Sequence, residues 1–253
     1  METGTRLTEG KTKIVYAHPS DATRAILEHK DGITAGDGAR RDTILGKGAL
    51  AGRTAANVLA LLNRAGIATH FVAAPEPTYT VVRRCTMIPL EVVMRRIATG
   101  SYLRRHPEVS EGTRFAPPLV EFFLKDDARH DPQITPDEIV AQTIASAAEV
   151  EQMTSVGRQV LQVLEAAWQV QDVTLVDIKI EFGRPSPNEL IVADVIDNDS
   201  WRIWPGGEKG RMLDKQVYRN AQQVDATLLD DLYQRYARVA ALTDTFANAP
   251  LPG

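Results

Sequence analysis

Apolar and polar residues alternate in several short stretches near the start of the chain, and such stretches are typical of strands with one buried face. The pattern predicts strands at Glu9–Tyr16, Arg24–His29, Ile67–Ala73 and Tyr79–Cys85. From Leu50 to Ala65 the apolar residues instead recur at helical spacing, and Gly66 is a typical residue just past a helix end. The first third of the chain is therefore expected to hold paired strands and one helix.

The remaining part of the chain mixes both patterns. The run Thr135-Pro136-Asp137-Glu138 has the form of a capping box with proline at the first helical position, and it predicts a long helix to about Trp168. Strands are expected at Leu175–Phe182 and Leu190–Ile196, joined by a turn, and an amphipathic helix is expected at Leu228–Phe246. Because strands and helices follow one another without a regular βαβ rhythm, we expect an α+β fold.

Other segments lack a regular period. Glycine and charged residues crowd Asp31–Asp42, which predicts a loop. Pro117, Pro118 and the Asp126–Pro132 stretch predict irregular structure in the middle of the chain. The apolar Met87–Val93 segment is interpreted as a crossing from one lobe to the next.

Composition and charge narrow the class of protein. The chain has 253 residues, 43% hydrophobic and 25% charged, which is ordinary for one compact globular unit. A net charge of −4 argues against general nucleic-acid binding, where a basic face is expected. No stretch approaches the ~18 apolar residues of a membrane span, and the polar first residues lack the apolar centre of a secretory signal. The single cysteine, Cys85, excludes an internal disulfide, so we expect a cytoplasmic protein.

Charged side chains share one face of the predicted strand at Leu175–Phe182. Alternate residues of a strand point to the same side, so Asp177, Lys179 and Glu181 lie opposite an apolar face. A sheet with one solvated side is the competing interpretation. The next strand favours a site, because Asp194 stands in an apolar run and a buried carboxylate needs a partner. In a hairpin, Glu181 and Asp194 can face one cavity and bind Mg²⁺ that bridges phosphates.

Basic residues elsewhere fit anionic substrates, although each has a plain structural alternative. Lys11 and Lys13 follow Gly10 and point the same way in an extended segment, where they could neutralise phosphate charge, but most such lysine pairs are solvated. Arg95 and Ser101 could bind a phosphate together with backbone N–H groups, or the arginine could cap a turn.

Two polar segments are candidate ligand loops. Three glycines within Lys30–Arg40 indicate either close ligand approach or a flexible surface loop. The Asp197–Arg202 segment is too polar to continue a strand, so it is either a solvated turn or a loop at the metal. In the second interpretation Arg202 pairs with a phosphate or carboxylate, and Trp201 and Trp204 anchor the loop.

Six motifs occur together in an order typical of one family. They are Glu9-Gly-Lys-Thr-Lys, Thr34-Ala-Gly-Asp-Gly-Ala-Arg, Met87-Ile-Pro-Leu-Glu-Val-Val-Met-Arg-Arg-Ile-Ala-Thr-Gly-Ser, Phe123-Leu-Lys-Asp-Asp, Leu175-Val-Asp-Ile-Lys-Ile-Glu-Phe-Gly and Val195-Ile-Asp-Asn-Asp-Ser-Trp-Arg-Ile-Trp-Pro. On these motifs the chain resembles the phosphoribosylaminoimidazole-succinocarboxamide synthase (SAICAR synthetase) family from about Leu7 to Tyr218. The long motifs at 87–101 and 175–183 are highly specific in combination.

The resemblance implies a step of purine biosynthesis. ATP, carboxyaminoimidazole ribotide (CAIR) and L-aspartate would become ADP, phosphate and the succinocarboxamide SAICAR. The implied fold is a two-lobed α+β fold related to ATP-grasp enzymes, with a β-rich N-terminal lobe at 1–86 and a larger C-terminal lobe at 87–253. ATP and Mg²⁺ would be the cofactors and would lie between the lobes.

The family's residue roles transfer to the matching positions of this chain. ATP is expected to contact Gly10, Lys11, Thr12, Lys13, Met87 and Lys125, and the metal is expected at Glu181 and Asp194. The ribotide site would include Glu91, Arg95, Ser101 and Arg202, under a closing loop that holds Thr34, Asp37, Gly38 and Arg40. Asp177 and Lys179 would line the reacting centre, where Lys11 and Lys13 would also act.

One motif departs from the pattern of many bacterial members. They read Asp-Glu-x-Ser-Pro-Asp where this chain has Asp194-Val-Ile-Asp-Asn-Asp, which is more similar to the synthetase half of the animal bifunctional enzyme. Asp194 is kept in this version. Roles at Asp197 and Asp199 do not transfer directly.

The expected mechanism passes the γ-phosphate to the CAIR carboxylate, and the aspartate amine then attacks the acyl phosphate. A small-molecule kinase could use the same lysines and carboxylates but would leave a stable phosphorylated product. A nucleotide-binding sensor would bind ATP without turnover. The apolar face of Leu228–Phe246 fits either the core or a homo-oligomer interface.

Overall fold

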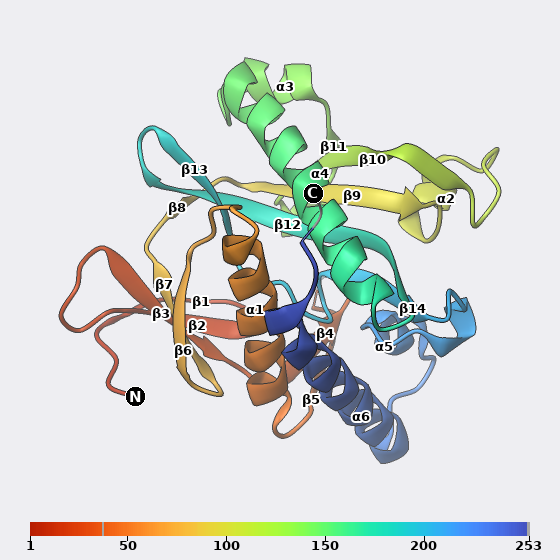
Figure 1. The fold of residues 1–253 in the computed structure, drawn as a ribbon, viewed down its shortest axis with the longest axis horizontal. Coiled ribbons are helices and arrows are strands. Elements are labelled where there is room, and N and C mark those ends of the chain that lie inside the picture. Colours follow the sequence, from red (N-terminus) through yellow and green to blue (C-terminus); the bar gives the residue numbers. More distant parts are fainter. Residues whose placement is uncertain (37, 252–253) are drawn as a thin grey trace.

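The computed structural model describes residues 1–36 and 38–251, and two sheets dominate it (Figure 1). The first sheet is antiparallel and has the strand order β1-β2-β3-β7-β6. Its strands are β1 (Arg6–Glu9), β2 (Lys13–Ala17), β3 (Arg24–His29), β6 (Phe71–Glu76) and β7 (Tyr79–Arg83). A separate hairpin pairs β4 (Gly32–Ala35) with β5 (Arg40–Thr43).

The second sheet has the order β11-β10-β9-β12-β13, and β8 and β14 also pair with the long strand β12. Its strands are β8 (Thr86–Met87), β9 (Leu90–Ile97), β10 (Arg114–Leu124), β11 (Gln133–Ile134), β12 (Val173–Ser186), β13 (Glu189–Ala193) and β14 (Trp201–Pro205). Every pairing in it is antiparallel. The mixture of antiparallel sheets with helices confirms the α+β class.

Three long helices pack on this framework. Helix α1 (Lys47–Arg64) lies against α6 (Ala226–Thr243) and the first sheet, whereas α4 (Ala147–Gln169) covers the second sheet (Figure 1). The shorter helical segments are α2 (Ser101–Arg105), α3 (Pro136–Ala141), α5 (Gln216–Asn220), η1 (Asp127–Arg129), η2 (Lys209–Arg211) and η3 (Asp244–Asn248). In the described part of the chain, no helix is long and apolar enough to cross a membrane.

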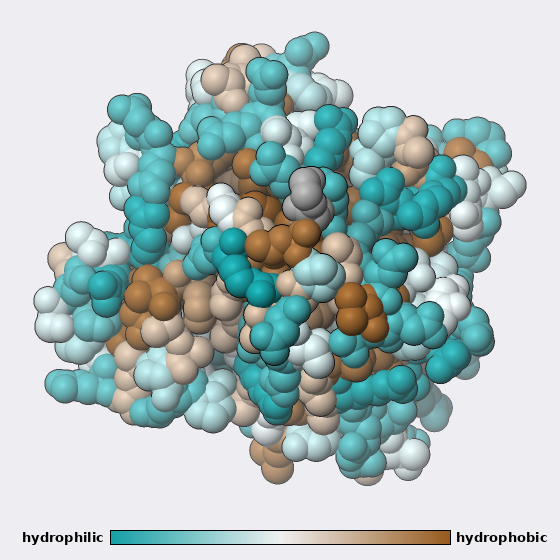
Figure 2. All heavy atoms as spheres, in the orientation of Figure 1, coloured by the Kyte–Doolittle hydropathy of each residue, from teal (hydrophilic) through white to brown (hydrophobic). Residues whose placement is uncertain are grey.

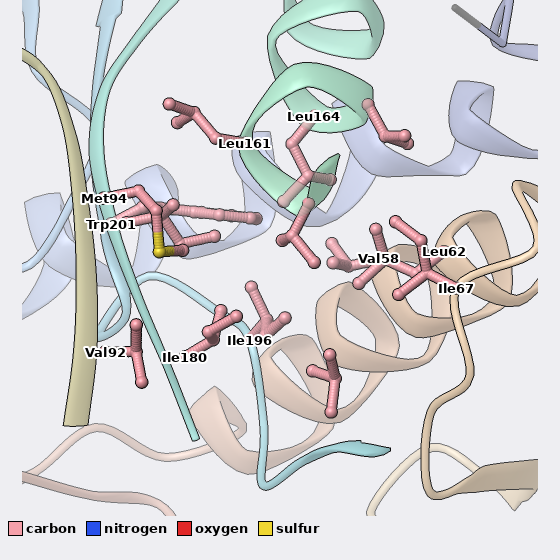
Figure 3. Packing of buried hydrophobic residues seen from close by; sticks show 14 of the residues in the cluster. Val58, Leu62, Ile67, Val92, Met94, Leu161, Leu164, Ile180, Ile196 and Trp201 are labelled. Carbon is pink, nitrogen blue, oxygen red and sulfur yellow. The ribbon is translucent and has the colours of Figure 1, made fainter. Parts of the chain in front are cut away.

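The main buried core lies between the second sheet, α4 and α1. Figure 3 shows side chains from all three meeting there, among them Val58, Leu164 and Ile180. On β12, Ile178, Ile180 and Phe182 are at most 1% exposed, so one face of this strand is fully covered. The charged residues between them therefore point to the opposite side, as the alternation predicted.

Polar side chains cover most of the face of the molecule that Figure 2 shows, with apolar side chains between them in small groups. The most exposed large apolar side chains are Leu45 and Val170, at 82% and 62%. They lie on different segments, and single exposed apolar residues of this kind are normal in folded proteins.

Several local predictions are confirmed. The helix expected at Leu50–Ala65 is α1, and Gly66 after it has a positive φ of 80°. At α3 the Thr135 side chain accepts the Glu138 N–H while Glu138 accepts the Thr135 N–H, which is the capping box predicted from the sequence. The strands at 175–182 and 190–196 form the hairpin of β12 and β13.

Three expectations were wrong. The predicted long helix is two helices, because Thr143 adopts a left-handed φ of 54° and a second capping box at Ser146 and Glu149 starts α4. The Asp31–Asp42 segment contains the β4–β5 hairpin instead of only a loop. Despite Pro117 and Pro118, the middle of the chain forms the eleven-residue strand β10. Its pairing with β9 shifts register between Arg114 and Leu119, and prolines are tolerated at such an irregularity.

Buried histidines make stability depend on pH. The Nε2 atom of His29 lies 2.9 Å from the Thr80 hydroxyl, and burial, aided by the charges of Lys13 and Lys47, lowers the pKa of His29 from 6.5 to about 4. Because the unfolded chain takes up this proton first, the stabilisation is complete above pH 6.5 and is lost between pH 6.5 and 4. His29→Gln should therefore flatten the pH dependence of the urea-unfolding free energy by roughly 2–3 kcal/mol over this range. Equal slopes for both proteins would contradict the assignment.

Candidate active site

A cavity of about 1050 Å³ receives residues from both sheets. Its walls come from the turn between β1 and β2, the β4–β5 hairpin, strands β9 and β12, the segment after β13, and α5. Most predicted site residues line it: Gly10, Lys11, Thr12, Lys13, Thr34, Gly38, Glu91, Arg95, Ser101, Lys125, Asp177, Lys179, Glu181, Asp194 and Arg202. Segments more than 180 residues apart in sequence are thus brought to one cleft.

Two of the other predicted site residues, Met87 and Arg40, lie outside the lining. Met87 is 42% exposed on β8, where it pairs with Gly183 of β12, and it does not line the cavity. Arg40 is also outside the lining: its guanidinium donates to the Tyr218 carbonyl at 2.9 Å and lies 5.5 Å from the Tyr218 ring centroid. Asp37 falls outside the described residues. The ligand contacts expected of these three residues stay predictions.

Lysines and carboxylates form a cluster of two neighbouring ion-paired groups in the cleft, and Lys179 of one group acts electrostatically on Asp194 of the other. Lys13 forms an ion pair with Asp194. The Lys179 Nζ lies 2.7 Å from Glu181 Oε1 and 3.2 Å from Glu91 Oε1, and Lys125 Nζ lies 2.6 Å from Glu181 Oε2. The cluster therefore joins the β1–β2 region to β9, β12 and the end of β13.

The β12–β13 hairpin explains why the two predicted metal carboxylates are neighbours. Glu181 is opposite Ala193, so Asp194 is the next residue on the partner strand. Asp194 has a left-handed φ of 63°, which aspartate tolerates better than most residues, and its N–H donates to His70 Nδ1 at 3.2 Å. This backbone turn ends β13 at the cavity wall.

Mutual attraction keeps the cluster charged. Burial alone would raise the pKa of Asp194, but the charges of Lys13 and Lys179 outweigh it and hold this pKa well below the usual range. Burial would lower the pKa of Lys179, but Glu181 and Glu91 outweigh it and raise this pKa. The cleft thus presents fixed charges at neutral pH.

The carboxylates fit Mg²⁺ that is shared with a ligand. Among the described residues, no group of three or more His, Cys, Asp or Glu side chains is arranged to hold a metal ion. Mg²⁺, however, usually takes one or two protein carboxylates and fills its other positions with water and phosphate oxygens. Glu181 on β12 and Asp194, directly after β13, supply such a pair.

Beside this cluster, Asp177 binds two arginines. Its Oδ2 atom accepts from Arg95 Nη1 at 2.9 Å and also from Arg202 Nη1. Strand register places Asp177 opposite both Arg95 on β9 and Arg202 on β14. Gly100 makes room for the second arginine, because a Cβ there would lie 2.6 Å from Arg202 Nη2.

Behind the loop after β13 lies a buried charged group that the sequence analysis did not identify. Asp199 Oδ2 lies 2.7 Å from Lys215 Nζ, its Oδ1 accepts from the Tyr236 hydroxyl, and the buried Lys47 Nζ lies 5.1 Å from the Tyr236 ring centroid. Burial would raise the pKa of Asp199, but Lys215 and Lys47 lower it, whereas burial and the Asp199 charge raise the pKa of Asp197.

Only the Asp197–Asp199 part of this group had a signal in the sequence. Asp197, Asp199 and Ser200 line the cavity, and this favours the interpretation of the loop as part of the site. Trp201 is 2% exposed and packs edge-on against Trp168 at 5.3 Å between ring centroids, which confirms that it anchors the loop. Lys47 and Lys215 come from distant segments with no motif of their own.

Comparisons with known proteins identify the family of the chain. The family model described as SAICAR synthetase matches residues 6–235. The phosphoribosylaminoimidazole-succinocarboxamide synthase of Chloroflexus aggregans is 74% identical over 96% of this chain and 97% of that protein.

Solved structures give the same result. The Ehrlichia chaffeensis synthase structure has a TM-score of 0.86 at 29% identity, covering 98% of this chain and all of that chain. A structure described as SAICAR synthetase (Type-2) in complex with ADP has a TM-score of 0.81 at 32% identity, covering 91% of this chain and 97% of that one. The match extends over both sheets and the cleft, and the chain belongs to the SAICAR synthetase family.

Proposed function

We propose that this chain is an ATP-dependent ligase of purine biosynthesis that joins L-aspartate to the carboxylate of CAIR and releases SAICAR, ADP and phosphate. The observation that carries the proposal is the single cleft in which Lys13, Lys179, Glu181 and Asp194 form one charged cluster. Membership of the SAICAR synthetase family supports it, and so does the ADP complex of a related synthetase.

The lysines of the cluster are suited to phosphate chemistry. Lys13, next to the Gly10–Thr12 turn, would hold ATP phosphates and offset the charge that develops during transfer, together with Lys11. Lys125 Nζ lies 2.6 Å from Glu181 Oε2, and Lys125 would contact the nucleotide as the family resemblance implies. Glu181 and Asp194 would hold Mg²⁺, which when bound would supply neutralisation of the phosphate charge.

The arginine side of the cleft is suited to the ribotide phosphate. Arg95 and Arg202 meet at Asp177, and Ser101 lines the same cavity. Guanidinium groups bind phosphate oxygens through several N–H donors at once, which fixes orientation as well as affinity. CAIR held there would direct its carboxylate toward the lysine cluster, since Lys179 is two residues from Asp177 on the same face of β12.

We further propose an acyl phosphate as the intermediate. The γ-phosphate of ATP is transferred to a CAIR carboxylate oxygen and ADP leaves. The aspartate amine then attacks the acyl carbon and loses a proton, the C–O bond breaks, and inorganic phosphate departs with that oxygen. Positioning and electrostatic stabilisation supply most of the catalysis in such a reaction.

Omission of single components tests the function. ADP release should require ATP, Mg²⁺, CAIR and L-aspartate together, and CAIR labelled with ¹⁸O in its carboxylate should transfer one labelled oxygen to phosphate. Complete absence of label transfer would exclude the acyl phosphate. A stable phosphorylated product without L-aspartate would support the kinase alternative, and nucleotide binding without turnover would support the sensor.

Gly100→Ala should weaken CAIR binding through Arg202. The added methyl would lie 2.6 Å from Arg202 Nη2 and displace the guanidinium, so we expect the KM for CAIR to rise about tenfold, the scale of one charged hydrogen bond, with little change in the KM for ATP. Gly112→Ala is the matched control, because Gly112 also has a positive φ but a Cβ there meets nothing within 4 Å. An equal rise in the KM for CAIR in both variants would show that backbone strain, and not displacement of Arg202, causes the loss.

Three further expectations from the sequence stay predictions. The first is a lobe boundary near residue 86. The strands of the first sheet all precede β8 in the chain and those of the second sheet begin with β8, which fits this boundary. A cytoplasmic location is the second such expectation, and cell fractionation would test it. A homo-oligomer is the third, and a measurement of molecular mass in solution would test it.

A further inference from the structure

A row of alternating charges crosses the second sheet beside the cleft. Across the strands, Asp177 stands opposite Arg95 on one side and Arg202 on the other. Glu121 on β10 is opposite Val93, two residues from Arg95 on the same face of β9. The row therefore runs from Glu121 through Arg95 and Asp177 to Arg202.

Two carboxylates fix the orientation of the Arg95 guanidinium. Its Nε donates to Glu121 Oε2 and its Nη1 donates to Asp177 Oδ2 at 2.9 Å. Arg95 is only 3% exposed and Glu121 5%, so water does not compete for these hydrogen bonds. Nε and Nη1 each use one N–H group in these contacts, so both N–H groups of Nη2 and the second N–H group of Nη1 are left to meet a ligand in the cleft.

The second oxygen of Glu121 reaches the other predicted phosphate ligand. Glu121 Oε1 accepts from Arg105 Nη2 on α2 and from Gln133 Nε2 at 3.3 Å. Arg105 in turn donates from Nη1 to the Ser101 carbonyl at 3.2 Å. Glu121 thus holds Arg95 directly, and through Arg105 it holds the start of α2, where Ser101 lies.

We infer that Glu121 is a positioning residue of the ribotide site, which sets how Arg95 and Ser101 present their donors to the CAIR phosphate. This inference rests on the proposed function. Glu121 does not line the main cavity, so it acts through the groups that it holds. A buried carboxylate between two guanidinium groups can serve stability alone, and the experiment must separate the two roles.

Glu121→Gln tests the role with little change in volume. The glutamine side chain carries no negative charge, and its NH2 group faces one of the two arginines. A donor facing a donor is unfavourable, so the guanidinium of Arg95 should tilt. We expect the KM for CAIR to rise about tenfold or more, with the KM for ATP within about twofold of the original. Glu121→Asp keeps the charge and should recover part of the CAIR affinity.

Glu165→Gln is the matched control for stability. Glu165 on α4 forms a two-pronged ion pair with Arg96, at 2.6 and 2.7 Å, on the opposite face of the same strand. Both glutamine variants lose a carboxylate–arginine pair, but only Glu121→Gln should change the ratio of the two KM values. Melting temperatures measured alongside give the structural loss in each.

The outcomes separate this inference from the proposed function. If the unaltered enzyme turns over CAIR and Glu121→Gln changes both KM values as Glu165→Gln does, the inference is wrong and the proposed function stands. If the unaltered chain neither binds CAIR in a calorimetric titration nor forms SAICAR, the proposed function itself fails. A selective rise in the KM for CAIR, with partial rescue by Glu121→Asp, supports the positioning role.

Discussion

Replacing Lys13 with methionine is expected to lower kcat by about a hundredfold or more, the range found when one preorganised charge donor is removed from an active site. The Lys13 ammonium is the partner of Asp194, and it reaches the cleft from the first sheet while Asp194 reaches it from the second. Methionine keeps most of the side-chain volume but removes the charge. The transferring phosphoryl group would then lose a fixed cation, and Asp194 would lose its main neutralising partner.

The measurement is the steady-state rate of SAICAR formation with saturating ATP, CAIR and L-aspartate. Lys209→Met serves as the control, because Lys209 pairs with Glu111 at 2.6 Å, is 48% exposed and does not line the cleft. Its rate should stay within about twofold of the original, as exposed pairs contribute little. An unchanged kcat in the Lys13→Met enzyme would show that Lys13 does not act on the transferring phosphate.

Much of the site could be predicted from the sequence because strand periodicity fixes which side chains share a face. Asp177, Lys179 and Glu181 alternate with residues that are buried in the core, and the next predicted strand, Leu190–Ile196, carries a single acidic residue, Asp194. A hairpin brings the two carboxylates near each other, but its register, with Ala193 opposite Glu181, and the left-handed turn at Asp194 are known only from the structure. The family motifs assign functional roles to these same positions, so the strand pattern and the family resemblance pointed to the same residues.

Long-range contacts were the part that the sequence could not predict. Lys47 begins one helix, Lys215 precedes another and Tyr236 lies within a third, yet all three surround Asp199. Each alone has the pattern of an ordinary helix residue. Glu121 was missed for a similar reason, since the two prolines before it indicated irregular structure and hid the strand β10. Pairing between distant strands overrode this local signal.

The extent of α3 and α4 shows the limit of helical periodicity as a signal. The apolar spacing continues across Thr143 and Ile144, so the sequence predicted one helix from the first capping box onward. The structure starts a new helix at the second box, where Ser146 and Glu149 satisfy the free N–H groups of α4. The sequence did contain this capping box, as Ser146 followed three residues later by Glu149. It indicated the helix start better than the apolar spacing did.

Asp177→Asn is expected to reduce kcat/KM for CAIR about a hundredfold and to lower the free energy of unfolding by about 3 kcal/mol. Asp177 is 3% exposed, and its Oδ2 atom is shared by Arg95 and Arg202. Removing one partner of a buried ion pair leaves uncompensated charge, here on Arg202 and in part on Arg95, which keeps its pair with Glu121. Asparagine can still accept a hydrogen bond but cannot offset either charge, so both arginines should shift.

The division of this loss between KM and kcat decides what Asp177 does. The family resemblance implied that Asp177 lines the reacting centre, and in that case kcat should carry most of the loss at saturating CAIR. The contacts with Arg95 and Arg202 instead favour a positioning role, in which the KM for CAIR carries it. Asp244→Asn, which breaks an exposed pair with Arg53, is the control and should leave both constants unchanged. A loss confined to kcat would place the Asp177 carboxylate among the reacting groups and make its arginine contacts secondary.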